Sequence, residues 1–180
     1  MPPRRAPRLL PRSTIWALGC YPADARAWDA VPVKVIRAQL SDVSQAAPLF
    51  AAYREFYGEP YDLDVSASFL ASRLARDESI VLIARNDDGV AVGFSQIYPA
   101  FSSTRLAPIW ILNDLYVSEE ARGTGAVDAL LDTAATLAVD AGAVAIELST
   151  AHTNLRAQAV YDRSGYEADT VYKHYEKPLP

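Results

Sequence analysis

One stretch decides the fold: Leu112-Asn113-Asp114-Leu115-Tyr116-Val117-Ser118-Glu119-Glu120-Ala121-Arg122-Gly123-Thr124-Gly125-Ala126-Val127. An apolar strand here runs into a glycine-containing turn and then into a helix. Several backbone N–H groups therefore meet at the helix N-terminus, where the helix dipole adds positive potential. Glycine at positions 123 and 125 reaches positive φ without strain and lets a diphosphate approach the backbone. The stretch predicts a phosphate-binding turn.

Two other phosphate-binding motifs are excluded by the residues around this turn. No Lys-Ser/Thr pair follows the glycines, as a nucleotide P-loop requires. There is also no Gly-x-Gly-x-x-Gly with an acidic residue about 20 positions further on. Taken alone, the turn leaves one alternative open, which is a tight strand–helix connection that binds no ligand.

The sequence on both sides of the turn predicts a single α/β domain. We expect strands over residues 33–37, 79–85, 90–99, 109–117 and 143–148, with a hairpin turn at 86–89. We expect helices from the Ser41-Asp42 cap to Gly58, over 66–76, over 123–141 and over 157–164. Residues 166–177 are predicted as one or two further antiparallel strands. The expected fold is a mixed, mostly antiparallel sheet of six to seven strands, with about four helices on both faces.

The first 32 residues differ from the rest of the chain. They hold six of the 12 prolines and show no helical or strand period. Four arginines, Arg4, Arg5, Arg8 and Arg12, precede the first acidic residue, Asp24. We interpret residues 1–32 as a flexible N-terminal tail, with a targeting peptide as the alternative, and residues 33–180 as the functional domain.

Composition excludes several classes of protein. Apolar residues make up 51% and charged residues 22%, which is typical of a folded globular chain. No apolar run reaches the roughly 20 residues that span a bilayer. The single cysteine, Cys20, favours a reducing compartment and offers no metal site. Residues 24–180 carry 13 basic and 22 acidic side chains, which disfavours nucleic acid and favours cationic ligands. We therefore expect a cytoplasmic protein with a small-molecule partner, without metal, nucleic acid or membrane.

A second motif follows the turn: Asn154-Leu155-Arg156-Ala157-Gln158-Ala159-Val160-Tyr161, and then Gly165-Tyr166. Together with Arg122-Gly123-Thr124-Gly125, it resembles the GNAT acetyltransferases. Their motifs are Arg/Gln-x-x-Gly-x-Gly/Ala and Asn-x-x-Ala-x-x-x-Tyr-x-x-x-Gly-Phe/Tyr. The resemblance covers about residues 33–179, and the pair of motifs is far more specific than either one. It implies the GNAT fold and an N-acetyltransferase that moves acetyl from acetyl-CoA to a primary amine.

The resemblance also implies where acetyl-CoA lies. The strand before the turn would pair with the pantetheine arm, and a bulge there would aim a backbone N–H at the thioester carbonyl. The turn and the start of the helix would hold the diphosphate. The implied cofactor residues are Leu115, Tyr116, Val117, Arg122, Gly123, Thr124, Gly125, Ala126, Val127, Asn154 and Ala157.

For catalysis, Tyr161 matches the tyrosine that donates a proton to the departing CoA thiolate. The resemblance implies direct attack by the amine in a ternary complex, without a covalent enzyme intermediate. Asp114 would bind the ammonium or relay its proton, and the acidic, aromatic loop at 55–64 would border the acceptor pocket. The acceptor is then a small cationic amine. The implied acceptor residues are Glu55, Tyr57, Glu59, Asn113 and Asp114.

Three positions depart from the family pattern. Residues 101–117 also resemble the spermidine/spermine acetyltransferases in part, but Asn113 replaces the first residue of their acidic pair and cannot act as a base. Val127 stands where glycine or alanine is expected and would crowd the diphosphate, and Asp128 would repel it if the two face each other. Two alternatives stay open: a non-catalytic acyl-CoA-binding module and a protein lysine or N-terminal acetyltransferase. A homodimer is also left open.

Overall fold

The computed structural model describes residues 33–179, so the predicted tail at 1–32 lies outside the described residues. The described chain contains one sheet with the strand order β1-β2-β3-β4-β5. The first three pairings are antiparallel, and β4 pairs with β5 in parallel. The strands are β1 (Lys34–Arg37), β2 (Ile80–Arg85), β3 (Ala91–Ser102), β4 (Ala107–Val117) and β5 (Ile146–Glu147). The mixed, mostly antiparallel sheet is thus confirmed.

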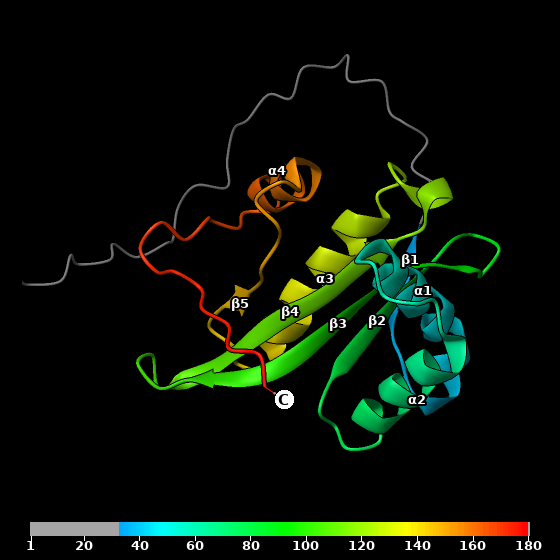
Figure 1. The fold of residues 1–180 in the computed structure, drawn as a ribbon, viewed down its shortest axis with the longest axis horizontal. Helices are drawn as coiled ribbons and strands as arrows, with labels where there is room; N and C mark the ends of the chain where they lie inside the picture. The colour runs from blue at the N-terminus through cyan, green and yellow to red at the C-terminus, as the bar shows by residue number, and fades with distance from the viewer. Residues whose placement is uncertain (1–32, 180) are drawn as a thin grey trace, which may run out of the picture.

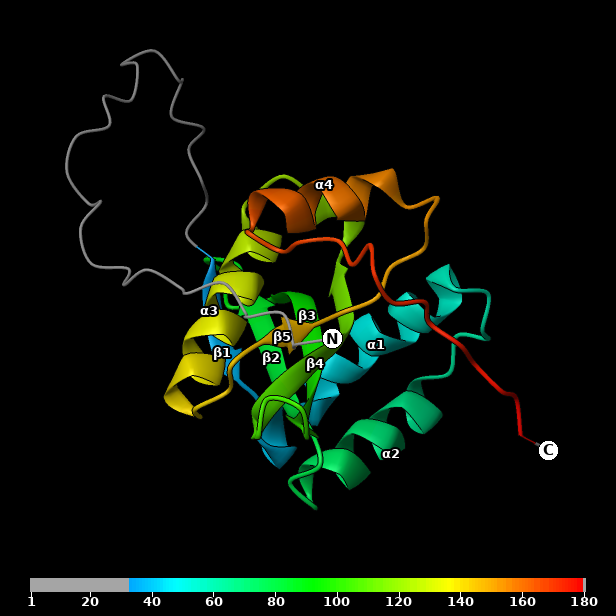
Figure 2. The same ribbon diagram turned by 90° about the vertical axis from the view of Figure 1, so that its left-hand side faces the viewer.

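Four α-helices surround this sheet. They are α1 (Val43–Phe56), α2 (Leu63–Leu74), α3 (Ala126–Asp140) and α4 (Leu155–Arg163), with short 3₁₀ turns at Leu40–Asp42 and Glu119–Ala121. Helices α1 and α2 cover one face and α3 covers the other, while α4 lies beside the first turn of α3 (Figure 1). Figure 2 shows the sheet edge-on between these two helical layers. Within residues 33–179, no helix combines the length and the apolar character that crossing a bilayer demands.

The two layers bury two separate cores. On the α3 side, Leu82 and Ile97 of the sheet pack with Leu130 of α3. On the other side, Phe94 packs with Phe50 of α1, and their ring centroids are 5.8 Å apart. Strand β2 is buried along most of its length because it contributes to both cores. Both faces of the sheet are therefore packed against helices.

Local signals explain most element ends. Helix α2 begins at Leu63, three residues before its predicted start, because the Asp62 carboxylate accepts the N–H of Val65 at 2.9 Å. The hairpin turn between β2 and β3 is confirmed, with the N–H of Gly89 donating to the carbonyl of Asn86 at 2.9 Å. The cap at the start of α2 was the signal that the sequence interpretation missed.

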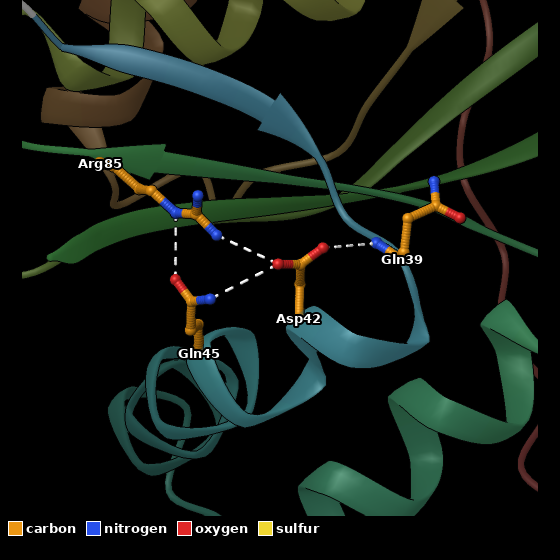
Figure 3. Close-up of polar contacts among 4 residues, drawn as sticks. All are labelled: Gln39, Asp42, Gln45 and Arg85. Carbon is orange, nitrogen blue, oxygen red and sulfur yellow. Dashed lines mark hydrogen bonds and ion pairs between the residues drawn. The ribbon is translucent and has the colours of Figure 1, made fainter. Parts of the chain in front are cut away.

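A polar cluster fixes α1 against the sheet (Figure 3). One oxygen of Asp42 accepts Arg85 Nη2 at 3.1 Å, and the other accepts the backbone N–H of Gln39 at 2.9 Å. The side-chain oxygen of Gln45 accepts Arg85 Nε at 3.0 Å. This arrangement ties the start of α1 to the end of β2, so the far end of α1 reaches the region of the candidate site.

The predicted count of six to seven strands is wrong, because the described residues contain five. Strand β5 has two residues instead of six, and residues 166–177 contain no strand. The Asp169 carboxylate accepts the N–H groups of Val171 and Tyr172 at 2.7 and 2.9 Å. These amides serve a local turn and are not available to a neighbouring strand.

Candidate active site

A β-bulge shapes the end of β4. Gln96 of β3 pairs with Asp114, whereas the next residue, Ile97, pairs with Leu112, so Asn113 is the extra residue. The family resemblance implies a bulge in this strand. The observed bulge, at Asn113, lies two residues before Leu115. The side chains of Asn113 and Asp114 consequently lie close together, with Asn113 Nδ2 donating to Asp114 Oδ1 at 3.1 Å.

The bulge brings a carboxyl group into a buried network. Asp114 is 5% exposed, and Gln96 Nε2 donates to its Oδ2 at 2.8 Å. Burial raises the pKa of Asp114 above its ordinary value, while hydrogen bonds from Gln96, Asn113 and Tyr53 act in the opposite direction. The Gln96 amide also donates to the Tyr98 hydroxyl at 2.9 Å. Asp114 is therefore a carboxyl group with fixed orientation and raised basicity.

A cavity of about 260 Å³ opens beside this network. Its walls come from the end of α1, the end of β4, the start of α3, the segment after β5, and α4. It exists because β5 pairs only with Trp110 and Ile111, which leaves the rest of β4 without a strand on that side. Ten predicted site residues line it: Tyr57, Asn113, Leu115, Tyr116, Val117, Arg122, Val127, Asn154, Ala157 and Tyr161.

The glycine turn lies at one end of the cavity. Gly123 and Gly125 have φ values of +85° and +88°, and a Cβ added to either would meet nothing within 4 Å. Within the described chain, the N–H groups of Gly123, Gly125, Ala126 and Val127 make no backbone hydrogen bond. Donors of this kind at the start of α3 are suited to bind an anion.

Other predicted residues in the turn contribute differently. The Thr124 hydroxyl donates to the carbonyl of Ala121 at 2.7 Å, which stabilises the turn. The side chain of Ala126 is buried in the α3-side core. The Asn154 carboxamide accepts the N–H of Ala157 at 3.2 Å and so caps α4. Thr124 and Ala126 therefore bring their backbone to the site, and Asn154 both caps α4 and lines the cavity.

Three predicted acceptor residues are absent from the lining of the cavity: Glu55, Glu59 and Asp114. Glu55 and Glu59 are exposed and absent from its lining, and Glu59 pairs with Arg54 at 3.7 Å. Asp128 likewise bonds to Arg163, with the closest contact at 2.8 Å. Asp114 lies directly behind the lining, bonded to Asn113, and is the one predicted acceptor acid that is buried beside the cavity.

Seven lining residues were missed by the sequence interpretation: Tyr53, Phe56, Leu112, Ser149, Thr150, Arg156 and Val160. Tyr53 and Phe56 were assigned to the apolar face of a helix, although their spacing with Tyr57 places all three together at its end. Ser149 and Thr150 follow β5 after Leu148, at the carboxyl end of a parallel strand pair, where ligand-binding side chains commonly lie. That position was a usable signal.

The phenol of Tyr161 faces the same cavity as Arg122 and Val127. Its ring packs edge-on against Tyr166, with centroids 5.7 Å apart. Burial first, and then the nearby Tyr57 and Tyr166, raise the pKa of Tyr161 to about 12. The hydroxyl therefore stays protonated at neutral pH and is available as a hydrogen-bond donor or acid.

Comparison with known proteins adds to this geometry. The sequence model of the acetyltransferase (GNAT) family matches residues 46–166. The chain belongs to the GNAT family. The match includes the glycine turn and the Tyr161 motif, and it ends at Tyr166, before the segment that contains no strand. GNAT enzymes generally use acetyl-CoA.

Relatives place this GNAT chain among N-acetyltransferases. It is 43% identical over 148 residues to the uncharacterized N-acetyltransferase YhfO of Bacillus subtilis, covering 82% of this chain and 99% of that protein. It is 33% identical to a probable acetyltransferase of Haemophilus influenzae, over 57% and 70% of the two chains. A crystal structure of a probable acetyltransferase shares 41% identity with a TM-score of 0.77, covering 82% and 98%. The protein is an acetyltransferase.

Proposed function

We propose that this GNAT enzyme moves the acetyl group of acetyl-CoA to the primary amine of a small cationic acceptor, by direct attack within a ternary complex. One observation carries the proposal: a single cavity is lined by the glycine-turn region, the bulged end of β4 and the Tyr161 phenol. These three features supply an anion site, a backbone edge and a proton donor. Each of the three would accelerate acyl transfer from a CoA thioester.

The cofactor end of the cavity fits acetyl-CoA. The unused N–H groups at Gly123 and Gly125, with Arg122 beside them, suit a diphosphate. The edge of β4 from Leu115 to Val117 lies beyond the short pairing with β5, so it can add an extended pantetheine arm as a strand. Ala157 and Asn154 of α4 form the opposite wall.

The residues around the reacting groups support a direct transfer. Acetyl-CoA supplies the activated thioester. Tyr161, protonated at neutral pH, donates its proton to the leaving thiolate. Asp114, whose pKa is raised by burial, binds the acceptor ammonium or takes its proton through water. The backbone N–H groups near the bulge are suited to stabilise the oxyanion.

The acceptor end favours an amine with one positive charge and an apolar body. Its wall is aromatic, with Tyr53, Phe56 and Tyr57 close together; the rings of Tyr53 and Tyr57 are 5.0 Å apart. One carboxyl group, Asp114, lies behind that wall, while Glu55 and Glu59 lie outside the cavity. Among residues 33–179, Asp114 is the one carboxylate beside this wall, so the further ammonium groups of a polyamine would have no carboxylate partner there, and a monoamine is the better match.

The Tyr161→Phe variant tests this proposal. A screen of primary amines with acetyl-CoA, read by release of free thiol, first finds the best acceptor. With that amine we expect Tyr161→Phe to lower the turnover number by at least ~10-fold, because one general acid is lost. Acetyl-CoA affinity, measured by titration calorimetry, should stay within ~2-fold. The matched control is Tyr166→Phe, because Tyr166 stacks on Tyr161 but does not line the cavity. An unchanged turnover number in Tyr161→Phe would show that the Tyr161 hydroxyl takes no part in the mechanism.

A non-catalytic acyl-CoA-binding module is the second candidate. It is favoured by Val127, a branched side chain that lines the diphosphate end of the cavity, and by the amide of Asn113. The same screen separates the two candidates. Tight acetyl-CoA binding without thiol release for any amine would favour the binding module, and Val127→Gly should then leave the protein inactive.

A further inference from the structure

Helix α4 is attached to the rest of the domain by few polar contacts. It carries Tyr161 and, at its start, Asn154 and Ala157, so its position determines one wall of the cavity. Within the described part of the chain, every hydrogen bond between residues 148–179 and residues 33–147 joins Arg163 to Asp128. Leu148, Val160, Tyr161 and Tyr166 add apolar packing against the α3-side core.

The contact between Arg163 and Asp128 has a forked geometry. Arg163 Nη2 donates to both carboxylate oxygens, at 2.8 and 3.1 Å, and Nε donates to Oδ1 at 3.2 Å. Three hydrogen bonds from two nitrogens to two oxygens restrict the relative orientation of the two side chains as well as their separation. No residue of α4 is fully buried, and Val160 and Tyr161 are the side chains of this helix that pack against the α3-side core, so apolar packing constrains its orientation weakly. The fork adds a directional contact.

The two partners belong to the helices that form opposite walls of the cavity, α3 and α4. Asp128 is in the first turn of α3, next to Val127 and directly after the glycine turn. Arg163 is the last residue of α4, two positions after Tyr161. The fork therefore joins the element that begins with the anion-binding turn to the element that carries the phenol.

We propose that the Asp128–Arg163 pair positions α4, and through α4 the Tyr161 hydroxyl, relative to the glycine turn. Both residues act as positioning residues, since neither lines the cavity. The effect on turnover rests on the proposed function, because it requires Tyr161 to act as the acid. The effect on the position of α4 does not, and it can be measured without a substrate.

Hydrogen–deuterium exchange on the free protein tests the attachment. We expect Arg163→Gln and Asp128→Asn to speed amide exchange in residues 155–163 by ~3- to 10-fold, because α4 loses its fixed orientation. The matched control is Arg105→Ala, which breaks another exposed pair, Arg105–Glu147 at 3.5 Å, and should leave α4 exchange unchanged. Exchange rates equal to wild type in both fork variants would overturn the proposal, whatever the enzyme acetylates.

Kinetics test the consequence for the phenol. With acetyl-CoA and the best amine of the screen, both single variants should lower kcat by ~5-fold while KM for the amine stays within ~2-fold. The double variant Asp128→Arg with Arg163→Asp should recover kcat to within ~2-fold of wild type. If the pair acted only through charge near the diphosphate, the two single variants would change activity in opposite directions. That result, or a double variant as slow as the singles, would overturn the proposal.

Discussion

The two ends of the cavity are built from different parts of the chain. At the end proposed for the cofactor, the main-chain N–H groups and positive φ angles of the glycine turn lie between the lining residues Arg122 and Val127. At the end proposed for the acceptor, side chains of Gln96, Asn113 and Tyr53 surround the carboxyl group of Asp114. The first end depends on backbone shape, so added bulk should damage it most. The second depends on side-chain chemistry, so changes at constant size should damage it most.

The largest effect is expected at the backbone-built end. Gly125→Glu should weaken acetyl-CoA binding by at least ~100-fold, because it places bulk and negative charge in front of the turn. Gly125→Ala is the control: at a φ of +88° an alanine costs roughly 1–2 kcal/mol of strain, but its Cβ meets open space. Titration calorimetry measures both affinities, with circular dichroism to check folding. Wild-type affinity in the glutamate variant would place the cofactor elsewhere.

At the side-chain-built end, a change at constant size should matter most. Asp114→Asn keeps the shape but removes the negative charge and the proton acceptor, and should lower kcat/KM for the amine by ~30-fold. Acetyl-CoA affinity should stay within ~2-fold, since Asp114 lies at the other end. Steady-state kinetics and titration give the two numbers. Equal losses in both would show that the two ends are not independent.

The pH dependence should sharpen the same distinction. Burial raises the pKa of Asp114, and the proposed reaction requires its ionised form, so kcat/KM should fall as the pH drops through that raised value. Gln96→Leu removes a hydrogen bond that favours the ionised form and should move this acid limb to higher pH. Tyr98→Phe, which keeps that bond, is the control. If the acid limb of the pH–rate profile does not move in Gln96→Leu, Gln96 does not affect the pKa that controls the rate.

The smallest effect is expected for Arg122→Ala. Arg122 lines the cofactor end but is partly engaged by Glu119 at 2.8 Å, so its guanidinium adds only modest attraction to the diphosphate. We expect a ~3-fold loss of acetyl-CoA affinity that shrinks at high salt. A loss as large as that of Gly125→Glu would mean that side chains, and not the backbone, dominate this end.

Much of the fold could be predicted because its signals are local. The caps, the glycines and the apolar periods predicted the four helices and five strands of the described residues, in their order along the chain. The prediction of strands over 166–177 is wrong, because a local side-chain contact there favours a turn over a strand. Val171 and Tyr172 suit a strand by composition, yet one carboxylate, Asp169, takes their amides into a turn.

The candidate site was harder to predict because it depends on pairing between distant segments. The motifs indicated the glycine turn and Tyr161, since both follow from short patterns. The position of the bulge was not readable, because an extra residue such as Asn113 is defined only against its partner strand β3. For the same reason Gln96, which is central to the Asp114 network, carried no signal in the sequence.

The single extra residue in β4 also decides which way the rest of that strand faces. Trp110 and Leu112 contribute to the α3-side core, and after Asn113 the same side is taken up by Leu115 and Val117, while Tyr116 joins the opposite core. Removing one residue here would exchange inside for outside over the whole tip of the strand. Both substrates of the proposed reaction would lose their surroundings at once, so the alignment of donor and acceptor is encoded by an offset of one residue.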